Sequence, residues 1–183
     1  MVDHPIPQPP QRRYSFRPFP SYRFVVGEGH PHPTADPQGH SFGKEDNAEI
    51  LTRDNWDKNE DYLYGVDLYN YAYWWEAHEA FEELWAHFSR GSAESDLLQG
   101  IIKISAAFYK WHLHNAGGVK NHYAGGTRLL EQAMEYAPVY MGIDLQEYLD
   151  RLARHFALVL SAPDTGPDPL INYPFIILNK NPL

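Results

Sequence analysis

The distribution of proline constrains the fold of this chain more than any other sequence feature. Of its 15 prolines, nine lie in residues 1–45 and five follow residue 162, which leaves Pro138 alone in between. Proline inside a helix costs about 3 kcal/mol because it removes a backbone donor and clashes with the preceding turn. Long helices are therefore expected only in the middle of the chain, and both ends are expected to be extended.

The middle of the chain has helical periodicity throughout, and no stretch alternates strongly enough to predict a sheet. Short links of serine, glycine and asparagine separate the periodic segments, so neighbouring helices should be antiparallel. The expected helices cover residues 59–69, 72–88, 94–114, 119–136 and 144–160, with Ser92 or Ser95 as the cap of the third and Asn115, Gly117 and Gly118 at its end. The sequence thus predicts an all-α, single-domain antiparallel bundle of about five helices.

Three segments are expected within the 183 residues, which suit one domain. Residues 46–162 should form the helical bundle. Residues 1–45 contain RRYSFRPFPSYRFVV, which is too aromatic for a solvated tail, so we expect an extended arm packed on the body. Residues 163–183 should form an extended tail that docks on the body or reaches the second subunit of a homodimer.

Composition excludes several classes of function. A net charge of −9 argues against nucleic acid as a partner, because such binding depends on many Lys and Arg contacts to phosphates. The absence of cysteine excludes disulfides, thiolate metal sites and a cysteine nucleophile. No apolar run approaches the ~20 residues that span a bilayer, and the first residues lack the core of a signal peptide. We expect a cytoplasmic protein that acts on an unknown small molecule.

Motifs of other enzyme classes are absent. The chain has no G-x-S-x-G elbow, no Walker phosphate loop and no dinucleotide-binding glycine fingerprint. Gly125 and Gly126 fall inside an expected helix, where close helix packing explains them better than phosphate binding.

The run YWWEAHEAFEELW, residues 73–85, concentrates negative charge between tryptophans. On a helical wheel its apolar residues form one broad face, and the acids gather on the other side with His78 at the boundary. The acids are Glu76, Glu79, Glu82 and Glu83. Glutamates four residues apart repel by roughly 0.2 to 0.5 kcal/mol, so another group should offset their charge.

One interpretation of this helix is a metal site. His78 and Glu82 are four residues apart, the spacing that H-E-x-x-H motifs use for zinc, and Glu79 is placed to act as the base that activates water. Glu76 or Glu83 would then orient the ligands. A carboxylate in place of the second histidine suits one divalent ion of Zn, Mn, Fe or Mg, and the pattern does not choose among them.

Three further features support a site. Trp75 lies among the acids, which indicates that this side of the helix is partly covered. Gln99 and Lys103, four residues apart, form a polar stripe on the apolar third helix, and Lys103 could offset the glutamates. The segment GHPHPTADPQGH contains His30, His32 and His40 on extended chain that could fold over the acidic helix and add ligands.

Other interpretations remain open. The acids could form a solvated face, or a structural network of hydrogen bonds and ion pairs with Lys103, Gln99 or an arginine of the arm, in a non-catalytic binding or assembly module. A third alternative is a pocket that binds a small molecule without turnover, lined by aromatic residues: Trp74, Trp75, Trp85, Tyr109 and Trp111.

Three segments resemble the domain of unknown function 309 family: LYNYAYWWEAHEAFEELW, LLQGIIKISAAFYK and NAGGVKNHYAGGTRLLE. The family's hallmark is an E-A-H-E-x-x-E-E-x-W helix followed by an L-Q-G helix, and the resemblance covers about 59–136. PHPTADPQGHSFG also resembles an upstream segment of longer members. The resemblance implies a helical bundle and a metal-dependent hydrolase. The motif positions are Glu76, His78, Glu79, Glu82, Glu83, Trp85 and Gln99. Lys103 departs from the glutamine of many members, and its cation could supply the charge of a metal.

Overall fold

The structure is a computed structural model that describes residues 9, 13–45, 47–161 and 173–180. In this part of the chain the helices are α1 (Glu60–Asn70), α2 (Trp74–Trp85), α3 (Ala93–His112), α4 (Ala116–Tyr136) and α5 (Leu145–Ser161). A small antiparallel hairpin of β1 (Val139–Tyr140) and β2 (Ile143–Asp144) separates α4 from α5. The predicted all-α bundle of about five helices is confirmed. No described helix is both long and apolar enough to span a membrane.

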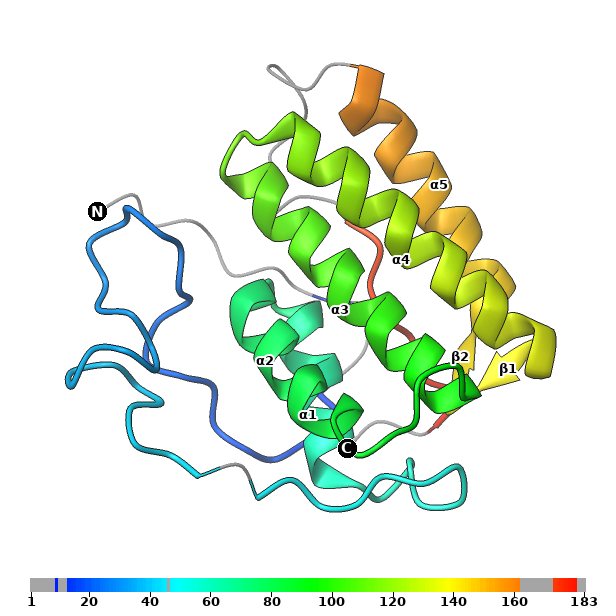
Figure 1. The fold of residues 1–183 in the computed structure, drawn as a ribbon, viewed down its shortest axis with the longest axis horizontal. Coiled ribbons are helices and arrows are strands. Elements are labelled where there is room, and N and C mark those ends of the chain that lie inside the picture. The colour runs from blue at the N-terminus through cyan, green and yellow to red at the C-terminus, as the bar shows by residue number, and fades with distance from the viewer. Residues whose placement is uncertain (1–8, 10–12, 46, 162–172, 181–183) are drawn as a thin grey trace.

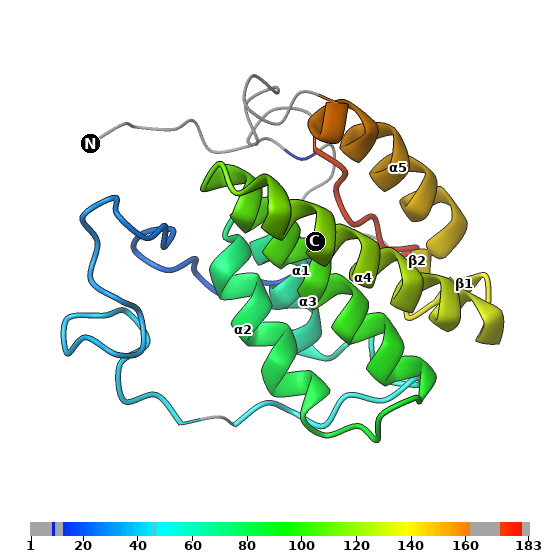
Figure 2. The ribbon, with the colours of Figure 1, turned by 45° about the horizontal axis from the view of Figure 1, so that its top comes forward.

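The helices pack in chain order, each against the next along the bundle. Figure 1 shows α3 and α4 as a long antiparallel pair, with α5 on the outer side of α4 and with α1 and α2 on the other side of α3. The view in Figure 2 shows the same order, and the N-terminal arm lies on the side of α1 and α2 away from α5. The exposed side of α2 is therefore free to face the arm.

Helix α3 runs through the centre of the hydrophobic core. Its apolar residues are almost completely buried nearly all round the helix: Leu97, Leu98, Ile101, Ile104, Ala107 and Phe108. Such a helix needs neighbours on several sides, which α2 and α4 supply. Because α2 packs its apolar face on α3, the acids of α2 must point to the other side.

Capping confirms one predicted helix end and changes others. Ser92 caps α3, because its side chain accepts a hydrogen bond from Ser95 N at 3.1 Å. Asn115 caps α4 by accepting from Gly118 N at 2.8 Å, so Gly117 and Gly118 lie in the first turn of α4 and do not end α3. Ala72 has a φ of 62°, which breaks the chain between α1 and α2 and delays the start of α2 to Trp74.

The hairpin was missed by the sequence analysis because each strand has only two residues. Its turn, Met141 and Gly142, has positive φ at both positions (44° and 81°), as two-residue hairpins of the primed type require. Tyr62 Oη donates to Met141 O at 2.9 Å, and Ile143 forms a bridge with Leu178. The hairpin thus links the bundle to the end of the chain.

The arm is attached to α1 by a buried carboxylate. Asp67, which is 1% exposed, accepts hydrogen bonds from Tyr14 N and Ser15 N, both at 2.9 Å. Arg13 Nε donates to the same carboxylate at 3.3 Å. Burial raises the pKa of Asp67, although these backbone donors and the Arg13 cation act in the opposite direction. The contact fixes where the arm begins to cross the helices.

Residues 173–180 lie against the body. Asn70 holds the backbone of Ile176 on both sides: its Nδ2 donates to Ile176 O at 2.8 Å, and its Oδ1 accepts from Ile176 N at 2.7 Å. Leu178 N donates to Tyr14 Oη at 3.0 Å, which joins this segment to the arm. Both described end segments are thus built into the same core.

Candidate metal centre on helix α2

The apolar face of α2 determines the direction of its polar residues. Trp74, Ala77, Phe81 and Leu84 are buried at helical spacing against the core. The intervening positions of the same turns carry His78, Glu79 and Glu82 on the outer side. Local sequence alone therefore presents these three side chains together.

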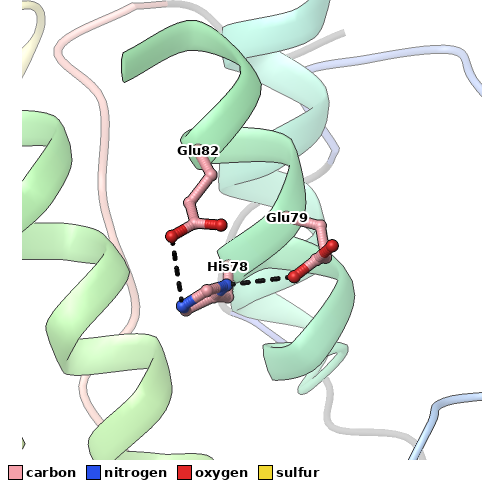
Figure 3. A group of neighbouring side chains, drawn as sticks. All are labelled: His78, Glu79 and Glu82. Carbon is pink, nitrogen blue, oxygen red and sulfur yellow. Dashed lines mark hydrogen bonds and ion pairs between the residues drawn. The ribbon is translucent and has the colours of Figure 1, made fainter. Parts of the chain in front are cut away.

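His78 lies between the two glutamates, as Figure 3 shows. Its Nδ1 is 3.3 Å from Glu79 Oε1, and its Nε2 is 3.8 Å from Glu82 Oε1. One ligand atom from each of the three residues lies within 4.8 Å of the others, which makes them a group that could hold a metal ion. Among the described residues, no other set of histidines and acids meets this geometry. It contains the three residues that the sequence predicted as ligands and base.

The chemistry of this donor set fits a divalent ion. An imidazole and two carboxylates suit the harder and borderline first-row metals. The side chains of His78, Glu79 and Glu82 are 30%, 39% and 50% exposed, so solvent reaches the group. A group that is open to solvent differs from structural sites, which enclose the ion with four protein ligands.

Glu76 does not belong to this group, although the sequence placed it near the ligands. Its side chain is only 5% exposed, and its Oε1 accepts from Phe24 N at 2.8 Å and from His40 Nε2 at 3.1 Å. Glu76 therefore connects α2 to the arm. Its other oxygen, Oε2, is buried with no hydrogen-bond partner in the described part of the chain.

The arm brings its histidines to the start of α2. His40 pairs with Glu76, and the His32 ring packs edge-on against Trp75 with centroids 5.4 Å apart. His30 stacks on Tyr22 at 4.5 Å. The histidine segment covers the first turn of the acidic helix, and His78 and its two glutamates form their group without these three histidines.

The polar stripe of α3 is less closely connected to the acids. Lys103 extends its aliphatic chain beside Gly125 of α4, and no hydrogen bond or ion pair between described residues joins it to a glutamate of α2. Gln99 is half-buried on the same helix, and Glu83 is half-buried on α2. Their predicted role around the site stays a prediction.

A cavity of about 530 Å³ lies between the arm, α1 and the acidic side of α2. Of the five aromatic residues predicted to line a binding pocket, only Trp75 borders this cavity. Trp74 and Trp111 are buried in the core, and Trp85 Nε1 donates to Ser95 Oγ at 2.9 Å. Tyr109 Oη accepts from Val26 N at 3.1 Å, so that residue secures the arm.

Two polar residues were missed by the sequence analysis. Asp67 lies among the buried apolar residues of α1. A charged residue at such a position could have indicated from the sequence that its carboxylate is buried and hydrogen-bonded. His122 on α4 is the second of these residues, and it is half-buried. Burial lowers the pKa of its imidazole, and the nearby Lys103 and Lys110 cations and His78 lower it further. A neutral imidazole therefore lies in the neighbourhood of His78 at neutral pH.

Comparison with known proteins agrees with the motifs. No curated protein matches the chain. Residues 62–121, which contain nearly all of α1, all of α2 and α3 and the start of α4, match the model of a family described as a domain of unknown function (DUF309). The confirmed span is shorter than the 59–136 over which the sequence resembles that family. Residues 62–121 therefore match the same family that the sequence motifs resemble.

Proposed function

We propose that this protein is a metal-dependent hydrolase whose single divalent ion is held on α2. The observation that carries the proposal is the grouping of His78, Glu79 and Glu82 on a solvent-accessible helix face, within 4.8 Å of one another. The group is open enough for a substrate to approach, and it adjoins a cavity that Glu79 and Glu82 also line.

His78 and Glu82 are the proposed ligands. Two ligand atoms each about 2.1 Å from one tetrahedral ion are separated by about 3.4 Å. The 3.8 Å between His78 Nε2 and Glu82 Oε1 is close to this value, so a small side-chain rotation would complete the pair. Because both residues lie on one rigid helix, their spacing changes little when other elements move.

Glu79 is proposed to orient the ligand and to act as the base. Its Oε1 lies 3.3 Å from His78 Nδ1, so it can accept the Nδ1 proton and leave the lone pair of Nε2 facing Glu82. An Nε2 lone pair beside a carboxylate oxygen favours a cation between them. The second oxygen of Glu79 remains able to take a proton from water. When bound, a divalent metal supplies a Lewis acid that makes water a better nucleophile.

Metal content tests this proposal directly. Protein purified without chelator or affinity metal should retain nearly one ion per chain, and His78→Ala and Glu82→Ala should lose it. Glu79→Gln should lower metal affinity about 10- to 100-fold, as expected when the partner of a metal-binding histidine is removed.

His87→Ala is the matched control, because His87 is exposed just beyond the end of α2 and lies outside the group. Elemental analysis and competition with a chromogenic chelator measure occupancy and affinity. Equal metal in all four variants would place the ion elsewhere and remove the basis of the proposed activity.

A second candidate function is a non-catalytic module whose acidic helix serves as a structural network. It is favoured by Glu76, which binds the arm through Phe24 N and His40. In this view His78 contacts Glu79 and Glu82 directly, and the three residues need no metal. Purified wild-type protein without metal, and without metal uptake on titration, would favour this candidate.

A further inference from the structure

The geometry points to a phosphate-binding site formed by Lys103 and Lys110 of α3 with His122 of α4, next to the candidate metal group. It would hold the phosphoryl group of a small, soluble molecule. Its use by a hydrolase rests on the proposed function, whereas the binding of phosphate itself does not depend on a metal ion.

One side of the central helix α3 is only partly buried. Between Gln99 and Phe108 the half-buried positions are Gln99, Lys103 and Ala106, and Lys110 continues the same stripe one turn later. The two lysines are seven residues apart, about 10 Å along the helix axis. Their side chains therefore leave α3 on the same side, with only the small Ala106 between them.

Two glycines of α4 leave room for these lysines. A Cβ at Gly118 would lie 2.9 Å from Lys110 Cγ. A Cβ at Gly125 would lie 3.2 Å from Lys103 Cδ and 3.8 Å from its Nζ. Gly118 and Gly125 are also seven residues apart, so they share one face of α4 as the lysines share one face of α3. Both lysine side chains thus lie directly on the surface of α4.

His122 lies between the two lysines. It follows Gly118 by four residues and precedes Gly125 by three, and residues at these spacings are neighbours on one helix face. Its imidazole is half-buried. Burial lowers the pKa of His122, and the Lys103 and Lys110 cations lower it further, which agrees with this placement. The three side chains therefore offer an imidazole N–H between two ammonium groups.

The two lysines have no anionic partner in the described part of the chain. Neither Lys103 nor Lys110 forms a hydrogen bond or ion pair with another described residue. A half-buried ammonium group loses part of its hydration, so an anion that supplies acceptors is favoured. The chain as a whole has a net charge of −9, and this face is a local exception to it.

A phosphoryl group matches these donors better than a carboxylate. It carries roughly two negative charges and three acceptor oxygens, so it can contact both ammonium groups and the imidazole together. Lysine binds phosphate as a point charge on a flexible stem, which lets two side chains converge on one group.

The proposed metal group adjoins this site. His78 is among the groups that lower the pKa of His122, so the two imidazoles are close enough to interact electrostatically. They belong to α2 and α4, which both pack on α3 (Figure 1). A molecule bound through its phosphoryl group would therefore lie beside the group on α2, and the substrate of the proposed hydrolase is a phosphorylated small molecule.

Calorimetric titration of chelator-treated, full-length protein with inorganic phosphate tests the inference. Saturable binding at one site is expected, and neither acetate nor phosphatidylglycerol vesicles should compete. Lys103→Gln and Lys110→Gln should each weaken phosphate binding about tenfold, because each removes one charge-assisted contact. Lys120→Gln is the matched control. Lys120 is exposed and precedes His122 by two residues, which turns it about 160° away on α4, so its loss should leave phosphate binding unchanged.

Metal retention separates this inference from the proposed function. Glu82→Ala should lose the metal and keep phosphate binding, whereas Lys103→Gln should lose phosphate binding and keep the metal. Phosphate binding by a protein that never takes up metal would support the site and overturn only the hydrolase. A wild-type protein that does not bind phosphate would overturn the site, as would equal affinities in the Lys103, Lys110 and Lys120 variants. Acetate binding as tight as that of phosphate, or binding to the vesicles alone, would overturn the assignment to a small phosphorylated molecule.

Discussion

The carboxylate of Asp67 is buried, and its one ion pair in the described part of the chain, with Arg13, is long. Its donors are mainly two backbone N–H groups of the arm, and Arg13 adds a longer contact at 3.3 Å. Burial raises its pKa, which means that desolvation is the largest influence on this group. The carboxylate is retained because Tyr14 N and Ser15 N would otherwise be buried without an acceptor.

Asp67→Ala should lower the free energy of unfolding by about 2 to 3 kcal/mol, since it leaves these two buried donors unsatisfied. Urea denaturation measures the loss, and limited trypsin digestion at Arg17 reports release of the arm. Asp61→Ala is the matched control on the same helix, because its contacts with Arg17 and with Glu49 N are both exposed and their loss should cost about 1 kcal/mol or less. Equal costs in the two variants would show that burial does not decide the strength of this attachment.

Helices α3 and α4 pack closely at two glycines that face each other, Gly100 on α3 and Gly126 on α4. A Cβ at Gly126 would lie 2.8 Å from Ile104 Cδ1 and 3.1 Å from Gly100 O. Ile104 is fully buried and cannot move away freely. The neighbouring Gly125 faces a different environment, because a Cβ there would meet only the flexible chain of Lys103, at 3.2 Å. The predicted close packing of the Gly125-Gly126 pair is thus carried by Gly126.

Gly126→Ala should destabilise the protein by about 1 to 3 kcal/mol, because overpacking outweighs the gain in helix propensity. Gly125→Ala should stabilise it by up to about 1 kcal/mol, since Lys103 can shift and the helix gains a better residue. Urea unfolding of both variants gives the comparison. Similar changes for the two would contradict this assignment of the helix contact.

The helices were predictable because their signals are local. Proline is absent from α1 to α4, and the apolar period repeats within each helix. The close approach of His78 and Glu82 was predictable for the same reason, since i and i+4 positions share one face of a helix, and Glu79 follows His78 directly in the sequence. Two other features could not be predicted in this way. Ala72 adopts a positive φ in a turn, which its residue type does not favour. The pair of His40 with Glu76 joins residues that are 36 positions apart in the sequence.

At the scale of the whole molecule, buried tyrosines join the segment that begins at Tyr173 and the β1–β2 hairpin to the bundle. Tyr69 Oη donates to Pro174 O at 2.9 Å and accepts from Tyr148 Oη at 2.9 Å. Tyr173 Oη donates to Asn70 O at 2.7 Å, and Tyr62 Oη donates to the hairpin. Each phenol is a neutral donor in a dry environment, and burial raises the pKa of all four. The stability that these four tyrosines contribute should therefore be lost at alkaline pH.

The sign of this dependence follows from proton binding. Above the unfolded-state pKa of about 10, the unfolded chain loses phenolic protons that the folded chain keeps, so the free energy of unfolding falls as pH rises. Each buried phenol should contribute a slope of about 1.4 kcal/mol per pH unit. Urea unfolding from about pH 8 to about pH 11, with tyrosinate absorbance recorded in parallel, should show stability that is flat at first and then falls steeply. Tyr148→Phe should reduce the slope by one phenol, whereas Tyr136→Phe, at an exposed position, should leave it unchanged. A gradual decline that begins well below pH 10, or equal slopes in the two variants, would mean that other groups control alkaline unfolding.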